Sequence, residues 1–253
     1  MNIAVSRAIP MSARIKAFLV HLGCSAVLAA AALALVFLVW YPAPLAEAIG
    51  VTNIFLLILG IDVIIGPILT LLVYKVGKKT LKFDLATIIV LQLAMFSYGL
   101  HTVAIGRPAW LVFSIDQFYV VRPADIDPSA QKNNVSSHTP WFGPSWVAVH
   151  LPEDKKARRQ LVIETLDSGQ GLFMNPNLYR PLNTETKQLQ HKAQPLSTLQ
   201  QFNSPDAIKS ALAQFNNRAT SWLPLWSNPK SMTVLLDKNG QVISIVNLNP
   251  WKQ

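Results

Sequence analysis

The chain has 253 residues, of which 51% are hydrophobic and only 14% charged, and its formal net charge is +9. Apolar residues concentrate before residue 105, so the composition predicts a membrane region followed by a more polar domain. Its single cysteine, Cys24, excludes a disulfide framework within one chain and a cysteine metal cluster. The basic charge suits anionic lipid head groups, cell-wall polymer or an acidic protein partner.

Three apolar segments are long enough to cross a bilayer, and they cover about residues 17–40, 51–74 and 84–104. The first ends at Trp40 and Tyr41, an aromatic pair typical of the membrane interface, directly before a proline. A signal peptide is the alternative for this segment. Its apolar core is longer than the ~7–15 residues of a signal peptide, which favours a membrane span.

Basic residues predict the orientation of these spans. They flank the amino terminus and fill the connection between the second and third spans, where Lys78, Lys79 and Lys82 lie. The first connection, residues 42–50, contains no lysine or arginine. This distribution predicts a cytoplasmic amino terminus and places everything after the third span outside the cytoplasm. We expect Lys82 to pair with Asp84 near the cytoplasmic interface.

The second span carries a carboxylate near its centre. An ionised Asp62 costs roughly 2.5–3.5 kcal/mol at the bilayer midplane, so it should face other helices, water or a partner. Gly66 and Pro67 follow about one turn later and indicate either a packing kink or a binding site. Because Gln92 lies at a similar depth in the third span, we expect a hydrogen bond between Gln92 and Asp62.

Residues 106–253 predict a compact α+β domain with a small antiparallel sheet and two or three helices. An aromatic and β-branched run at residues 110–121 predicts a strand. Proline and acidic residues at Leu151–Asp154 predict the start of a helix that ends near Leu166. The same signal predicts a second helix from Pro205 to about Asn216.

The last part of this domain has the clearest pattern. Two apolar runs at residues 232–236 and 242–246 flank Asn239 and Gly240. An Asn-Gly pair between two such runs favours a tight type I′ turn. The sequence therefore predicts a β-hairpin close to the carboxy terminus.

A basic run on the first predicted helix is the strongest charge cluster outside the membrane. Its members are Lys155, Lys156, Arg158 and Arg159. Such a run is either a solvated helix face or a docking surface for lipid or an acidic partner. Nucleic-acid binding is disfavoured because the predicted orientation places the run outside the cytoplasm.

Catalytic and cofactor signatures are missing from the sequence, including the dinucleotide, P-loop, zinc-protease and serine-hydrolase motifs. The five histidines are scattered without ligand spacing, so neither a metal nor another cofactor is expected. Core packing and membrane-surface contact explain the tryptophans between Trp141 and Trp251 at least as well as ligand stacking does.

Residues 14–122 combine a W-Y-P loop, a D-x-x-x-G-P-x-L-T core and a K-x-L-K-F-D-L start to the third span. In these motifs the chain closely resembles the type IV pilin accessory proteins of the TfpX/TfpZ family. The resemblance implies a bacterial inner-membrane protein that supports pilus assembly or the balance of extension and retraction, and it supplies no catalytic residues. The matching positions are Trp40, Tyr41, Pro42, Asp62, Gly66, Pro67, Lys79, Asp84, Gln92, Gly99, Arg107, Pro108 and Asp116.

These observations lead to the hypothesis of a non-enzymatic accessory protein. Asp62, Gly66 and Gln92 would face the transmembrane helix of a type IV pilin, while the basic periplasmic domain meets the pilin head. Two alternatives stay open. An enzyme that modifies pilin or envelope glycan would need converging acids or a nucleophile, and a membrane-anchored envelope sensor would need a cytoplasmic output module.

Overall fold

A computed structural model describes residues 12–126 and 138–252 and divides the chain into two compact units. We call the first the helical unit, which comprises the residues up to Leu35 together with Asn53–Val103. We call the second the sheet domain, which comprises Val36–Thr52 together with Ala104–Gln253. The sequence predicts a single boundary at residue 105, between the membrane region and the polar domain. The contacts, in contrast, assign the first connection between the spans to the sheet domain.

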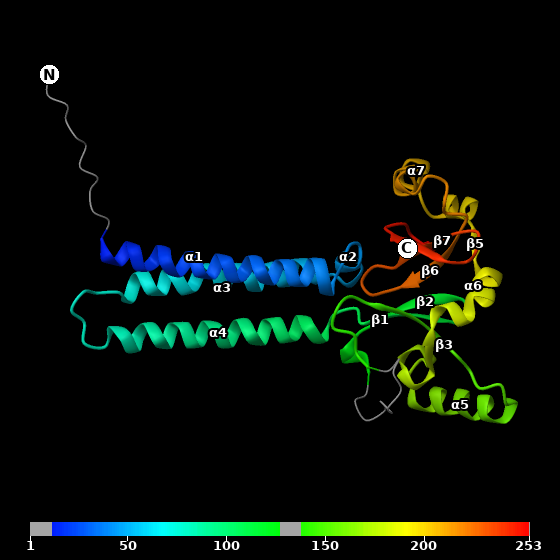
Figure 1. The fold of residues 1–253 in the computed structure, drawn as a ribbon, viewed down its shortest axis with the longest axis horizontal. Coiled ribbons are helices and arrows are strands. Elements are labelled where there is room, and N and C mark those ends of the chain that lie inside the picture. The colour runs from blue at the N-terminus through cyan, green and yellow to red at the C-terminus, as the bar shows by residue number, and fades with distance from the viewer. Residues whose placement is uncertain (1–11, 127–137, 253) are drawn as a thin grey trace, which may run out of the picture. The chain divides into compact units, whose positions relative to one another are not determined.

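Among residues 12–126 and 138–252, three helices are long and apolar enough to cross a membrane, as the sequence predicts: Ala13–Trp40, Val51–Val73 and Leu81–Ile105. The first consists of α1 (Ala13–Ala34) and a π-helical continuation, Leu35–Trp40, and the others are α3 (Val51–Val73) and α4 (Leu81–Ile105). Within the helical unit α1, α3 and α4 run side by side (Figure 1). Many of their leucines and isoleucines are exposed, as expected for helices that are solvated by lipid.

The described residues of the sheet domain form an eight-stranded sheet with the order β4-β3-β1-β2-β6-β7-β8, and β5 pairs with β6. The β1–β3 and β2–β6 pairs are parallel and the other pairs are antiparallel, so the sheet is mixed. This confirms the predicted α+β class. The strands are β1 (Trp110–Ser114), β2 (Gln117–Val121), β3 (Ser145–Val149), β4 (Tyr179–Pro181), β5 (Gln194–Pro195), β6 (Ser221–Trp226), β7 (Met232–Leu236) and β8 (Val242–Val246).

The prediction of one strand over residues 110–121 is wrong, because this run folds back on itself as the β1–β2 hairpin. Ile115 adopts a φ of 65°, and the amide of Asp116 donates to the carbonyl oxygen of Ser114 at 2.8 Å. A tight turn of this kind fits between two strands without interrupting the run of β-forming residues, so sequence pattern alone does not show it.

The carboxy-terminal hairpin of β7 and β8 is confirmed, but its turn is not type I′. That type needs a positive φ at both central residues, whereas only Gly240, with φ 76°, has one here. The Gly240 amide donates to the Asp237 carbonyl oxygen at 3.0 Å. The Asp237 side chain also accepts from the amides of Asn239 and Gln241, each at 2.8 Å, and thereby stabilises a longer loop.

In the part of the sheet domain that the structure describes, the α-helices are α2 (Leu45–Ile49), α5 (Lys155–Ser168), α6 (Thr186–Lys192) and α7 (Pro205–Leu212). Both helices that the sequence predicts in this domain are present as α5 and α7. Ser204 caps α7 by accepting from the Ala207 amide at 3.3 Å, and Pro205 occupies its first turn.

The first connection contributes to the main core of the sheet domain. Leu45 and Ala48 of α2 are buried in one apolar cluster with side chains of β1, β2, β6 and β7. Trp40 and Tyr41, which precede α2, are buried as well. The segment that the sequence presents as a short loop is therefore an integral part of the domain.

Candidate functional site

A set of polar side chains lies inside the helical unit, and we call it the Gln92 cluster: His21, Ser25, Asp62, Thr70 and Gln92. The Nε2 of Gln92 donates to the main-chain oxygen of Asp62 at 2.8 Å and to the Oγ of Ser25 at 3.1 Å. Its Oε1 lies 2.8 Å from the Nε2 of His21. One amide on α4 therefore makes hydrogen bonds to both α1 and α3.

The partners of Gln92 also define the proton on His21. A main-chain carbonyl can only accept, so the bond to Asp62 turns the Gln92 nitrogen to that side and its oxygen toward His21. His21 must then donate from Nε2, and its Nδ1 lies 2.6 Å from the Thr70 Oγ1. Gln92, His21 and Thr70 thus form one chain of hydrogen bonds that joins α4, α1 and α3.

Gly66 makes room for the Gln92 amide. A Cβ at position 66 would lie 1.9 Å from the Gln92 Oε1 and 2.5 Å from its Cδ, far inside van der Waals contact. Asp62, Gly66 and Thr70 are spaced four residues apart, which places them along one stripe of α3 that faces Gln92 and His21. The buried Pro67 follows directly, and α3 continues through it.

The carboxyl of Asp62 remains outside these hydrogen bonds. The expected bond between Gln92 and Asp62 exists, but it ends on the main-chain oxygen. Within residues 12–126 and 138–252, the structure shows no hydrogen bond or ion pair to the Asp62 carboxyl. The half-buried side chain instead lines two grooves of about 370 Å³ and 300 Å³ on the helical unit.

The walls of both grooves are mainly apolar. The larger groove runs between α1 and α4 and includes His21, Cys24 and Phe96. The smaller groove runs between α3 and α4, and its walls are Ile58, Ile61, Asp62, Ile65, Gly66, Leu69, Ile88, Leu91, Gln92 and Met95. A single carboxyl group among isoleucine and leucine side chains is the chemical signature of this site.

The lysines of the second connection are arranged differently from the prediction. Asp84 pairs with Lys78, at 2.7 Å between Nζ and Oδ2, and accepts from the Thr80 hydroxyl at 3.1 Å. Lys82 is not its partner, because residues two positions apart point to different sides of a helix. Lys79 and Lys82 are both exposed.

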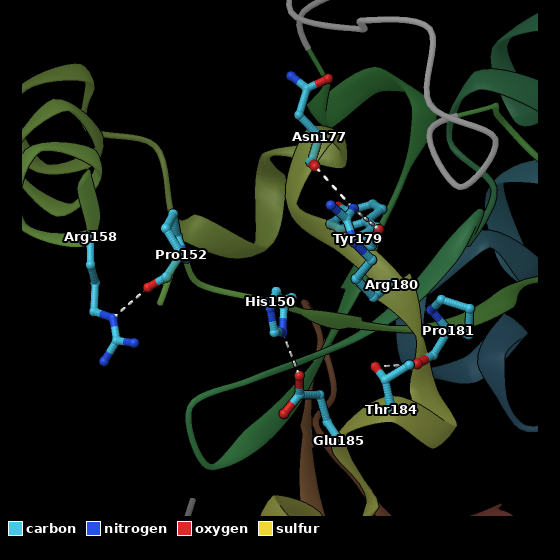
Figure 2. Close-up of polar contacts among 9 residues, drawn as sticks. All are labelled: His150, Pro152, Arg158, Asn177, Tyr179, Arg180, Pro181, Thr184 and Glu185. Carbon is cyan, nitrogen blue, oxygen red and sulfur yellow. Dashed lines mark hydrogen bonds and ion pairs between the residues drawn. The ribbon is translucent and has the colours of Figure 1, made fainter. Parts of the chain in front are cut away.

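The basic run Lys155, Lys156, Arg158 and Arg159 lies in the first turns of α5, and all four side chains are exposed. Arg158 donates from Nε to the Pro152 carbonyl oxygen at 3.0 Å, as Figure 2 shows. The same view shows His150 and Glu185 in contact, with 2.8 Å between Nδ1 and Oε1. Because all four side chains are exposed, an acidic surface can reach them.

The helix α2 is held by the loop between β6 and β7 and by Asn247, which follows β8. Glu47 accepts from Lys230 Nζ at 2.6 Å and from Asn247 Nδ2 at 2.9 and 3.0 Å. The hydrogen bond from Lys230 holds the pKa of the Glu47 carboxyl below its usual value. The carbonyl oxygen of Ala48 accepts from the Ser227 hydroxyl and from the Lys230 amide, each at 3.1 Å. We call these contacts the α2 clamp.

A cavity of about 540 Å³ in the sheet domain lies beside β8 and the first connection. Its walls include Pro42, Trp146 and Leu182, together with Val242–Ile245. The described residues that line it offer no carboxylate, imidazole, amine or thiol that could act as a general base. Nor do the described residues contain a group of three His, Cys, Asp or Glu side chains that could hold a metal ion.

His21, Ser25 and Thr70 are members of the cluster that the sequence analysis missed. A signal was present, because His21 and Ser25 are four residues apart and therefore share one stripe of the first span. Which stripe meets the polar face of the third span depends on how the helices are rotated about their axes, and the sequence does not state this rotation.

Three membrane-spanning helices with an internal polar cluster, joined to a mixed-sheet domain, define a multi-pass membrane protein with a folded domain attached. A family model, "Fimbrial assembly protein FimB", matches residues 10–50. No solved structure matches the chain.

Three curated relatives from Dichelobacter nodosus match as well. The fimbrial assembly proteins of serogroup E1 and of serogroup I are each 32% identical over 246 residues, which cover 92% of this chain and 94% of the relative. The fimbrial assembly protein of serogroups C1 and C2 is 36% identical over 109 residues, covering 42% of this chain and 83% of the relative. The chain belongs to the fimbrial assembly protein family. This confirms the expected link to fimbriae, although the relatives do not carry the narrower TfpX/TfpZ name.

Proposed function

We propose that this chain is a non-enzymatic accessory protein of type IV pilus biogenesis, of the TfpX/TfpZ kind, that binds the membrane helix of a pilin subunit. The observation that carries the proposal is the Asp62 carboxyl, half-buried between two apolar grooves, in a chain whose relatives are named fimbrial assembly proteins. Because lipid offers no donor at that depth, a partner helix with a polar group is the natural ligand.

The members of the Gln92 cluster have different roles in this proposal. Gln92 and Gly66 are in mutual contact and hold α1, α3 and α4 together, so they position the site from within. Asp62 is the group left to face a partner, with Ile61, Ile65 and Met95 as apolar neighbours in the smaller groove. The sequence suggests Asp62, Gly66, Pro67 and Gln92 as the pilin contact. Of these four residues, the proposal keeps Asp62 as the polar group that faces the pilin.

The orientation that goes with this function places the amino terminus in the cytoplasm and the sheet domain in the periplasm, with the spans in the inner membrane. Exposed Lys79 and Lys82 in or next to the second connection support it through the positive-inside rule. The exposed basic run of α5 is then available to an acidic surface of the pilin head.

The direct test replaces Asp62 by Asn and by Leu in the full chain and measures surface pili and co-purification of pilin. We expect Asp62→Leu to lose both and Asp62→Asn to retain part of both, since an amide keeps the shape and some hydrogen-bonding capacity. Asp84→Asn is the matched control, because that carboxyl is already paired with Lys78. Normal piliation and normal pilin co-purification of Asp62→Leu, at normal protein level, would contradict the proposal.

A genetic experiment identifies the step of pilus biogenesis at which the protein acts. The chain is deleted in cells with active pilus retraction and in cells where retraction is blocked, and piliation and pilin level are recorded. Pili that return when retraction is blocked indicate a protein that favours extension. Pili that stay absent indicate a protein that acts on the supply of subunits.

A further inference from the structure

Two neighbouring aromatic side chains are exposed on the sheet domain. Trp141 is 62% exposed and Phe142 is 88% exposed, and we call this pair the aromatic tip. Trp110, Phe113, Phe118 and Trp222 of the same domain are fully buried. Adjacent large apolar groups left in water are unfavourable, so an exposed pair of this size marks a contact with something outside the domain.

Arg107 ties this tip to the end of the third span. The buried guanidinium donates from Nη1 to the carbonyl oxygen of Ala104, in the last turn of α4, and from Nη2 to that of Pro140 at 2.9 Å. Its central carbon lies 4.7 Å from the centre of the Trp141 ring. A single side chain thus joins the last turn of a membrane span to the residues that carry the tip.

The end of the first span lies in the same place. The Trp40 ring centre is 6.0 Å from the Arg107 guanidinium carbon, and Trp40 is the last residue of that span. Gly143, directly after the tip, adopts a φ of 68°, and a Cβ there would lie 3.8 Å from the carbonyl oxygen of Val39. All these residues belong to the sheet domain, so the domain itself fixes the tip beside the ends of two spans.

The ends of the spans mark the depth of the bilayer surface. Each head-group layer beyond the hydrocarbon core is roughly 5–8 Å thick, which exceeds the distance between Arg107 and the Trp141 ring. Tryptophan is enriched in this layer. The position of the aromatic tip, its residue types and its exposure therefore all fit contact with this layer.

We propose that the aromatic tip, Trp141 and Phe142, inserts into the interfacial layer of the bilayer and seats the sheet domain on the lipid surface. The partner is the lipid itself, at the boundary between head groups and acyl chains. This contact adds a fourth attachment between domain and membrane, besides the three places where the chain passes between span and domain, at Trp40, Val51 and Ile105.

The test places a fluorescent probe at the tip of the full chain. In a Cys24→Ser background, Phe142→Cys is labelled with an environment-sensitive fluorophore, and the protein is reconstituted into vesicles of phosphatidylethanolamine and phosphatidylglycerol. The 88% exposure of Phe142 means that its replacement removes little packing. Emission wavelength and quenching by nitroxide-labelled lipid are measured.

Ile115→Cys is the matched control, because Ile115 is also apolar and 58% exposed. Ile115 lies at the turn of the β1–β2 hairpin. Trp110 and Val121 pair at the opposite end of the hairpin, and Trp110 follows shortly after Arg107 in the chain. Five strand residues separate the two ends of the hairpin by roughly 15 Å.

We expect blue-shifted emission at position 142 and quenching by nitroxide lipid several-fold stronger than at position 115. Equal quenching at the two positions would overturn the proposal, whether both are weak or both are strong. A blue shift at position 142 that occurs only after purified pilin is added would also overturn it, since the tip would then be a protein contact.

Discussion

In the helical unit, hydrogen bonds from Gln92 reach two other helices and a glycine makes room for them. In the sheet domain, apolar clusters fill the space around the sheet and bury Trp110 and Trp222 completely. The difference follows from the solvent. Lipid tails are as apolar as leucine, so burial against lipid gives helices no preferred partner, and polar groups and close approach decide their arrangement.

For the sheet domain, which folds in water, the relative importance of polar contacts and apolar burial is reversed. Removing apolar surface from water supplies most of the driving force for the sheet domain, and polar contacts such as the α2 clamp fix the position of one element. The two units should therefore respond to different substitutions. A buried aromatic matters most in the sheet domain, and a single methyl group matters in the helical unit.

The largest expected effect is that of Trp222→Ala in the sheet domain. Trp222 is fully buried, and its Nε1 donates to the Thr198 hydroxyl at 2.9 Å and to the Pro195 carbonyl oxygen at 3.1 Å. Loss of the side chain should lower the free energy of unfolding by about 3–5 kcal/mol, measured by chemical denaturation of the full chain in micelles. Trp226→Ala, at a position that is 40% exposed, is the control and should cost less than half as much. Equal losses would show that burial does not govern this domain.

The next effect is that of Gly66→Ala in the helical unit. The added Cβ would collide with the Gln92 amide, so either Gln92 leaves its partners or α3 moves away. Forcing a group into a packed site of this kind costs about 1–3 kcal/mol, measurable as a loss of resistance to unfolding by sodium dodecyl sulfate. Gly60→Ala is the matched control on the same helix, because a Cβ there meets nothing within 4 Å.

A double substitution separates the two reasons for this loss. In a Gln92→Ala background the collision at position 66 disappears, so Gly66→Ala should cost much less than in the wild-type chain. An undiminished cost in that background would mean that Gly66 is needed for a reason other than room for Gln92. The difference between the two costs measures the coupling of the pair.

The smallest expected effect concerns the α2 clamp. The folded-state pKa of Glu47 lies below its unfolded value, so the clamp stabilises the domain at neutral pH and this contribution is lost as the pH falls through the folded pKa. Lys230→Met should lower the stability at pH 7 by less than about 1 kcal/mol, because the pair is partly exposed. The test measures the unfolding of this variant at pH 7 and at a pH acidic enough to protonate Glu47. Lys238→Met is the control. A loss with Lys230→Met that is as large at the acidic pH as at pH 7 would contradict it.

Local signals predicted much of the fold. The three spans follow from apolar runs of about twenty residues, which few other structures require. The starts of α5 and α7 and the β7–β8 hairpin follow from proline, serine and Asn-Gly signals that act over a few residues. Each of these elements depends mainly on its own residues.

Contacts between distant segments were not predictable in this way. The parallel pairs β1–β3 and β2–β6 join strands through long connections, and β4 and β5 are too short to have a pattern of their own. The same reason applies to the site. Asp62, Gly66 and Gln92 stand out by residue type, whereas His21 joins them only through the rotation of α1 relative to α4.

The place of α2 in the core also sets an order for synthesis. Glu47 and Asn247 touch each other although they are 200 positions apart in the chain. At about 5–20 residues per second, a ribosome needs roughly 10–40 s to pass from one to the other. During that interval Leu45 and Ala48 lack the β6 and β7 side chains that later cover them. The newborn protein thus passes through a period with an incomplete core, and this is when a chaperone or protease would meet it.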